Sequence, residues 1–234
     1  MDTGELQMKK CKWMIWGILL FFMLGSIPSE VLADDSSRNV VFEDEWMTDQ
    51  EKHDCEVVIS HALSGMESDW SELEILVYLH GYLIRGCDFY EFDSNVHDAY
   101  GALVEGGAAC DGYASAFQML AQSAGIECEI VSSEAADHAW NMVKIENNYY
   151  HIDAMYDDDK AGCIDYEYFM LSTEEIQKDT YAHYVEDDWY VTGGWSGAYA
   201  TDTAYDSGAV WCEVDSEIVY VNGYWYGCVN GTIK

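Results

Sequence analysis

The sequence has few basic residues and almost no proline. Only 10 of its 234 residues are Lys or Arg, against 44 Asp or Glu, and the formal net charge is −34. A surface this negative repels nucleic acid and anionic membranes, so both are excluded as partners, and it favours a soluble monomer. The one proline, Pro28, lies near the N-terminus. Proline therefore marks no domain boundary in the rest of the chain.

The cysteines lack the Cys-X-X-Cys spacing that is typical of zinc sites, so no metal is expected on them. Beyond residue 33 there are seven cysteines, and an odd number leaves at least one thiol without an intramolecular partner. Two alternatives fit: one catalytic thiol with up to three disulfides, or seven free thiols. These cysteines are Cys55, Cys87, Cys110, Cys128, Cys163, Cys212 and Cys228.

The first 33 residues have the composition of a signal peptide. Three lysines lie between residues 9 and 12, twelve mainly apolar residues follow over 13–24, and Val31-Leu32-Ala33 resembles a cleavage site. Twelve residues are too few to span a bilayer, so we expect cleavage before Asp34 rather than stable membrane insertion. The mature protein is then secreted or held at the cell surface, and residues 34–50 form an acidic flexible segment.

Helix signals come first and strand signals later, which predicts an α+β domain over residues 51–200. Helical spacing of apolar residues predicts a helix over 51–66, and a capping box from Ser71 to Glu74 opens a second helix. Alternation predicts strands over 127–131, 139–145 and 149–154, and Ser172 begins a short helix.

Residues 205–234 are predicted to be a short β segment, with strands over 209–214, 217–221 and 224–229. The segment is either an edge of the main sheet or part of a separate β-domain. In this arrangement Cys212 and Cys228 lie on outer strands, too far apart for a disulfide.

A glycine-rich turn leads into Cys110. Apolar residues at spacings of three to four follow at Tyr113, Phe117 and Leu120, and they predict a helix that begins at Cys110 and stops at Gly125. The unpaired N–H groups and the macrodipole at a helix N-terminus favour the thiolate, which is the nucleophilic form. Two interpretations are open at this point: a nucleophile, or a buried structural cysteine.

His138 and Asp153 lie on neighbouring predicted strands downstream of the cysteine. A two-residue turn at Glu146-Asn147 sets Asp153 opposite Trp140 and diagonal to His138, with Cβ atoms about 7 Å apart, whereas a turn one residue later separates them. Thiol acyl transfer needs this set of side chains. The imidazole takes the thiol proton and returns it to the leaving amine, and the carboxylate orients the ring.

Short motifs occur in a fixed order along this region. They are Leu79-His80-Gly81-Tyr82-Leu83, Tyr100-Gly101-Ala102-Leu103, Cys110-Asp111-Gly112-Tyr113-Ala114, His138-Ala139-Trp140-Asn141 and Tyr150-His151-Ile152-Asp153. In this order and spacing they resemble the core of the transglutaminase-like superfamily, in its bacterial exported members, which are related to papain-like cysteine proteases. The resemblance covers residues 70–180.

The resemblance implies a papain-like and transglutaminase-like α+β fold. N-terminal helices, with the nucleophile at a helix N-terminus, pack on an antiparallel sheet. It implies a catalytic triad of Cys110, His138 and Asp153, with no metal and no cofactor. Trp140 is expected to shield the His–Asp pair, and Tyr100 is a candidate oxyanion donor.

The sequence departs from the family pattern at two positions. Met155 stands where the family often has Thr, and Gly81 stands where Asp is common. Neither change removes a catalytic group. Because of both changes, the details of substrate binding do not follow from the family pattern.

The expected function is exported thiol acyl transfer on amide bonds of proteins or peptides. An amine acceptor makes the protein a transglutaminase, and water makes it a cysteine protease or deamidase. The alternative is a non-catalytic cell-surface or binding module that keeps the fold.

The remaining histidines and acidic runs are given no catalytic role. His151 is expected to be a surface or packing residue, and the runs 157–159 and 186–188 are expected to be solvated loops rather than calcium sites. The other histidines have no partner motif: His53, His61, His80, His97 and His183.

Overall fold

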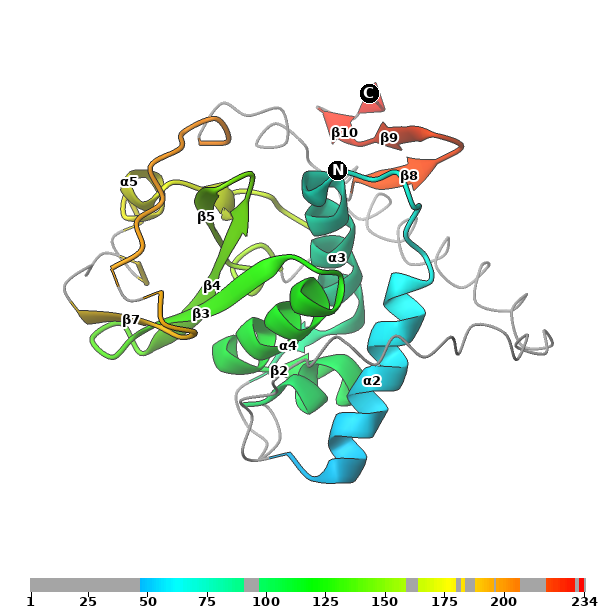
Figure 1. Cartoon of the computed structure of the whole chain (residues 1–234), viewed down its shortest axis with the longest axis horizontal. Helices are drawn as coiled ribbons and strands as arrows, with labels where there is room; N and C mark the ends of the chain where they lie inside the picture. Colours follow the sequence, from blue (N-terminus) through cyan, green and yellow to red (C-terminus); the bar gives the residue numbers. More distant parts are fainter. Residues whose placement is uncertain are drawn as a thin grey trace, which may run out of the picture. The chain divides into compact units, whose positions relative to one another are not determined.

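In the described part of the chain, three long helices and a five-stranded antiparallel sheet form the main structure (Figure 1). The structure is a computed structural model, and it describes residues 47–90, 97–158, 164–179, 182–183, 188–195, 197–206, 218–229 and 232–233. The predicted signal peptide and residues 34–46 lie outside these ranges. No helix among the described residues has both the length and the apolar character needed to cross a membrane.

The first two helices begin at capping boxes. Helix α2 (Asp49–Leu63) follows Thr48, whose hydroxyl accepts a hydrogen bond from the backbone N–H three residues on. This box starts the helix two residues before the predicted position. Helix α3 (Glu72–Gly86) begins at the predicted box, in which the Glu74 carboxylate accepts from the Ser71 N–H at 2.8 Å.

Helix α4 (Cys110–Ser123) matches the helix predicted from the spacing after the cysteine. It stops, as expected, before Gly125, whose φ of 89° lies in the left-handed region. The N–H groups of Gly125 and Ile126 bond back to carbonyl oxygens of the last helical turn. These bonds satisfy acceptors that would otherwise be left without a partner at the helix end.

The sheet has the strand order β6-β5-β4-β3-β7, and every neighbouring pair is antiparallel. Sequence alternation predicts its three longer strands but not the short β6 and β7. The strands are β3 (Glu127–Ser133), β4 (His138–Ile145), β5 (Asn148–Ile152), β6 (Phe169–Leu171) and β7 (Trp189–Val191).

The β4–β5 hairpin confirms the register predicted from its turn. Glu146 and Asn147 have φ values of 49° and 70°, as both central residues of a type I′ turn require. Asn141 then pairs with Ile152, so Asp153 is the first residue beyond the end of β5. This register brings the predicted His and Asp to the same end of the hairpin.

Each face of the sheet carries its own apolar core because side chains alternate along the strands. On one face, Val143 and Ile145 of β4 belong to the larger core, which includes residues of α2, α3 and α4. On the other face, Trp140 and Met142 pack in a smaller core with residues of β3, β6 and β7. Helix α4 contacts β3 and β4 (Figure 1), and the Asn141 side chain donates a hydrogen bond to a carbonyl oxygen of α4 at 2.9 Å.

Four short elements complete the domain. Strands β1 (Asp88–Phe89) and β2 (Gly107–Ala108) pair in parallel, and β2 ends two residues before Cys110. A π-helix, η1 (Gly101–Glu105), precedes β2, and α5 (Thr173–Ile176) begins after Ser172 as predicted.

The C-terminal segment forms separate two-stranded sheets within the described residues. Strands β8 (Val219–Val221) and β9 (Tyr224–Tyr226) make a hairpin, and β10 (Cys228–Val229) pairs with β11 (Thr232–Ile233). The prediction of one strand over 224–229 is therefore wrong, because the chain changes partner after Tyr226. The predicted strand 209–214, and with it Cys212, lies outside the described residues.

The described C-terminal strands do not extend the main sheet. They contact α3 instead: the Trp225 indole N–H donates to the Glu74 carboxylate at 2.8 Å, and its ring lies 5.0 Å from that of Trp70. The described strands rule out the alternative of a main-sheet edge for these residues. The predicted fold class, α+β with N-terminal helices packed on an antiparallel sheet, is confirmed.

Candidate active site

Cys110 is the first residue of α4 and is partly exposed. Ala109 before it has no side chain that could cap the helix, and the first intrahelical bond runs from the Tyr113 N–H to the Ala109 carbonyl at 3.0 Å. The N–H groups of Cys110 and Asp111 come before that bond, at the end of the helix that favours negative charge. Cys110 is thus placed as the helix prediction requires.

The other described thiols offer a contrast. Cys87 and Cys128 form no disulfide and are buried, with exposed fractions of 3% and 1%. Burial raises the pKa of Cys87 to about 12 and that of Cys128 well above its ordinary value. These two thiols and Cys110 form no disulfides, which excludes the alternative of three disulfides among the other six cysteines.

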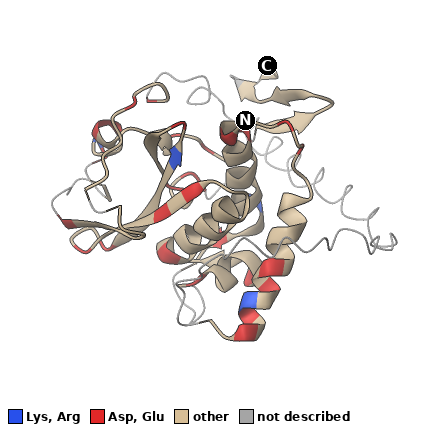
Figure 2. Ribbon diagram, in the orientation of Figure 1, with Lys and Arg blue, Asp and Glu red and all other residues tan. Residues whose placement is uncertain are grey.

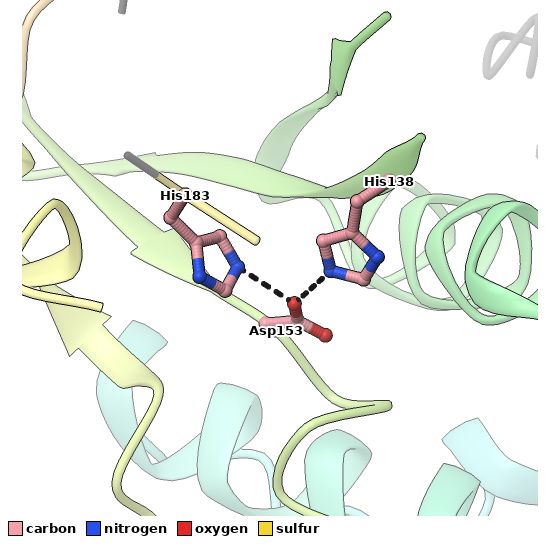
Figure 3. A group of neighbouring side chains, drawn as sticks. All are labelled: His138, Asp153 and His183. Atoms are coloured by element: carbon pink, nitrogen blue, oxygen red, sulfur yellow. Dashed lines mark hydrogen bonds and ion pairs between the residues drawn. The ribbon is translucent and has the colours of Figure 1, made fainter. Parts of the chain in front are cut away.

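His138 and Asp153 meet as predicted from the register. The Nε2 atom of His138 lies 2.5 Å from Oδ2 of Asp153, and both side chains are buried (Figure 3). The Cys110 thiol also acts on the His138 ring, and its influence helps to raise the pKa of the ring. Because Nε2 is engaged with the carboxylate, Nδ1 is the nitrogen left for the sulfur.

The pair holds opposite charges in a buried setting. Burial alone would lower the pKa of His138, but the charge of Asp153, the hydrogen bond to Asp153 and the influence of Cys110 raise it to about 10. For Asp153, burial would raise the pKa, and the charge and hydrogen bond of His138, together with His183, lower it below its ordinary value. The imidazolium and the carboxylate are therefore the favoured forms.

The backbone after β5 fixes the Asp153 carboxylate. Its Oδ1 atom accepts hydrogen bonds from the N–H groups of Met155 and Tyr156, each at 3.1 Å. Any residue other than proline can supply such a bond. The departure from the family pattern at Met155 therefore leaves this support of the carboxylate intact.

Trp140 covers the His138 ring. The two rings are stacked, with centroids 5.8 Å apart and planes at 17°. The Trp140 indole N–H donates to Nδ1 of His151 at 3.0 Å, and Nε2 of His151 lies 3.0 Å from the Thr173 hydroxyl. His151 is fully buried, so it packs behind the tryptophan and is not a surface residue.

His183 also belongs to this site, although the sequence analysis gave it no role. Its Nε2 lies 2.9 Å from Oδ2 of Asp153, and its Nδ1 lies 2.8 Å from a carboxylate oxygen of Asp179. The Asp179–His183 spacing of four residues is the one sequence signal that could have linked them, and it is a weak one.

The prediction of a solvated loop at residues 157–159 is wrong for Asp157. Its side chain is fully buried and lies 3.0 Å from Nε2 of His80 on α3. Burial raises the pKa of Asp157 well above its ordinary value and lowers that of His80 to about 3, so both groups favour the neutral form. The pair links the chain after β5 to α3. This tertiary contact cannot be predicted from a run of acidic residues in the sequence.

Tyr100 lies apart from the His138–Asp153 pair. Its side chain packs against the larger core, and the charged groups that act on its hydroxyl include Glu105 and, on α2, Asp54 and Glu51. Its suggested part as an oxyanion donor stays a prediction.

His138, Asp153 and His183 also present three atoms that could hold a metal ion, all within 4.8 Å of one another. Two ligands of a tetrahedral zinc ion, each at about 2.0–2.1 Å from the metal, lie about 3.3 Å apart. The N–O distances of 2.5 and 2.9 Å are shorter and are those of hydrogen bonds. Shared protons account for the arrangement better than a metal does.

Comparisons with known proteins agree with this architecture. The model of the transglutaminase-like superfamily matches residues 61–154, which include Cys110, His138 and Asp153. The chain therefore contains a transglutaminase-like superfamily core domain. Among curated proteins, none is significantly similar to the sequence.

Two solved structures are similar to part of this chain. One is a TGase, with a TM-score of 0.38 and 14% identity over 48% of this chain and 34% of the other. The second is a candidate cysteine protease from Cytophaga hutchinsonii, with a TM-score of 0.36 and 13% identity over 45% of this chain and 38% of the other. This chain spans little more than a third of the length of either.

Proposed function

We propose that the transglutaminase-like domain is a thiol acyl-transfer enzyme that acts on amide bonds of proteins or peptides. One observation carries the proposal: a partly exposed thiol at a helix N-terminus raises the pKa of a histidine, and that histidine is bonded to a buried carboxylate. Cys110 is the nucleophile, His138 the proton carrier and Asp153 the group that orients the ring.

In the first step, the Cys110 thiolate attacks the amide carbonyl carbon and forms a C–S bond. The carbonyl electron pair moves to oxygen, and the N–H of Cys110 is a donor for this oxyanion. The C–N bond then breaks as the His138 imidazolium gives its proton to the leaving nitrogen. A thioester remains on Cys110, and His138 is neutral.

In the second step, an acceptor resolves the thioester. Neutral His138 takes a proton from the acceptor as it attacks, and the thiolate and the imidazolium are restored. A primary amine as acceptor gives a transglutaminase, and water gives a protease or a deamidase. Both outcomes use the same three residues.

The charge of the chain supports substrates with basic groups. Acidic residues lie on helices, strands and loops of the described chain (Figure 2), and of the few basic residues, Lys144 and Lys178 are paired with Glu127 and Glu175. Such a surface attracts cationic protein partners and repels nucleic acid and anionic membranes.

The test is mass spectrometry of the full chain incubated with a peptide library and a labelled primary amine. Amine incorporation at glutamine identifies a transglutaminase, and cleavage or deamidation identifies a hydrolase. Cys110→Ala should abolish turnover, whereas the matched Cys128→Ala, which removes a buried thiol, should not.

Reaction with iodoacetamide tests the alternative of a binding module. Cys110 should be labelled quickly at pH 7, and slow labelling together with no turnover by the parent protein would leave a non-catalytic module as the better interpretation.

The domain is proposed to act outside the cell, because the N-terminal 33 residues have the composition of an export signal. N-terminal sequencing of exported protein should begin at Asp34. Exported material that begins at Met1 or Met8 would contradict the processing site.

A further inference from the structure

His183 lies on the far side of Asp153 from His138 (Figure 3). Both histidines use Nε2 to reach the same carboxylate oxygen, Oδ2, at 2.9 and 2.5 Å. The His183 side chain is fully buried, as its residue exposure of 0% shows. It is therefore shielded from bulk solvent.

The partners of His183 determine its protons. An ionised carboxylate only accepts hydrogen bonds, so each ring nitrogen must carry a proton to bond one. Nε2 faces Asp153 and Nδ1 faces Asp179, at 2.9 and 2.8 Å. A ring that donates from both nitrogens is an imidazolium, and the position of His183 between two carboxylates fits that form.

The groups around His183 fit a buried cation between two carboxylates. Burial and, after it, the charge of His183 lower the pKa of the neighbouring His151 to about 3, so that histidine is neutral. The titratable and charged groups that face His183 are Asp153, Asp179, His138, His151, Tyr156 and Tyr168.

We propose that His183, held by Asp179, is a positioning residue for the triad. The line then runs from Asp179 through the buried His183, Asp153 and His138, whose charges alternate, to the partly exposed Cys110. This inference rests on the proposed thiol chemistry for its use, but the charge of His183 can be measured without it.

The positive ring has two opposed effects on His138. Its hydrogen bond fixes the Asp153 oxygen that orients His138, which favours catalysis. Its charge also opposes the proton on His138, because the two ring centroids are only 5.2 Å apart. His183 therefore holds the carboxylate in place and limits how tightly His138 keeps the proton that it must give away.

The test is an NMR titration of the His138 ring in the full chain, in a Cys110→Ala background with a metal chelator present. Cys110→Ala removes a group that raises the pKa of His138, which brings the titration to a more accessible pH. It also abolishes acyl transfer, so the result does not depend on the proposed function.

Two variants remove the charge by different routes. In Asp179→Asn, the new amide donates to Nδ1 of His183, and the ring becomes neutral but still donates to Asp153. The pKa of His138 should rise by roughly one unit. In His183→Gln, the charge is lost and Asp179 stays negative, so the rise should be larger.

His80→Gln is the matched control. It makes the same change at another fully buried histidine bonded to an aspartate; burial lowers the pKa of His80 to about 3, so no charge is lost and the titration of His138 should not move. An unchanged pKa of His138 in Asp179→Asn, in protein shown to be folded by circular dichroism, would overturn the inference. A lowered pKa in that variant would do so too, because it would mean that His183 is neutral.

The two proposals fail separately. If the parent protein turns over no amide but the titrations shift as expected, the function is wrong and the charged His183 stands. If turnover is found and the titrations do not shift, the function stands and His183 is a packing residue.

Discussion

Asp153→Asn reverses the polarity of one atom at the centre of the site. The new amide oxygen can still accept from the N–H groups of Met155 and Tyr156, as Oδ1 does now. The NH2 group then stands where Oδ2 stood, 2.5 Å from Nε2 of His138. Since an amide NH2 only donates, the Nε2 atoms of both His138 and His183, which bond Oδ2 now, must give up their protons to accept from it.

The consequence is a histidine in the wrong form. The proton of neutral His138 is left on Nδ1, the nitrogen nearest the sulfur, and the ring cannot take a proton from the thiol. The charge that raises the pKa of His138 is also gone, so burial should bring that pKa below its ordinary value of 6.5. The imidazolium that stabilises the thiolate is therefore lost at pH 7.

Two magnitudes follow from this change. Loss of the imidazolium removes the activation of Cys110, so its alkylation by iodoacetamide should slow, by at most roughly 30-fold because an unactivated thiol is still a few per cent thiolate at pH 7. Turnover should fall more, by roughly 1,000- to 10,000-fold, because loss of the orienting carboxylate has an effect of that size in other triads.

The assay is time-resolved mass spectrometry of Cys110 alkylation at pH 7, with circular dichroism as the check on folding. Asp157→Asn is the matched control: that aspartate is equally buried and bonds His80, and its replacement should leave the alkylation rate near that of the parent. A folded Asp153→Asn protein that is alkylated as fast as the parent would refute the argument.

Two further predictions concern stability. Because folding raises the pKa of His138, the stability that His138 contributes is fully present below pH 6.5 and is lost as the pH rises towards 10. Because folding lowers the pKa of Asp153, the stability that Asp153 contributes is fully present above pH 3.8 and is lost on acidification. Urea unfolding of the parent and Asp153→Asn should differ most between about pH 4 and 6.5, by on the order of a few kcal/mol, and a difference that is constant up to about pH 10 would contradict this. Trp140→Ala removes a ring that is 1% exposed and should destabilise the fold by about 3–5 kcal/mol. It should lower kcat/KM less than Asp153→Asn does. Equal losses of kcat/KM in the two variants would mean that Trp140 does more than shield the His–Asp pair.

The parts of the site that the sequence predicts correctly depend on local signals. Glu146 and Asn147 make the turn that sets the register of β4 and β5, and both adopt positive φ. The periodicity after Cys110 and the position of Gly125 set the two ends of α4. Each of these signals acts over a few residues, so the sequence alone is enough to find it.

The parts that it does not predict depend on contacts between distant segments. Strand β7 has three residues and is held by β3, so that Val191 pairs with Val131. His183 comes thirty residues after Asp153, in a stretch without helical or strand periodicity. Neither segment carries a local sequence signal for regular structure, and only the packed sheet face shows that Val191 and His183 are buried.

The cost of burial is a last reason to regard this cluster as a site. Taking an ionised carboxylate and imidazolium groups out of water costs several kcal/mol for each ion, and their attraction often does no more than offset that cost. Apolar side chains at Asp153, His138 and His183 could continue the small core of Trp140 and Met142 on the same face of the sheet. Stability therefore does not account for three buried titratable groups that converge on one carboxylate oxygen and end at a partly exposed thiol. Proton transfer at Cys110 does account for them, because it needs a histidine whose charge is set by buried neighbours and whose other nitrogen reaches the sulfur.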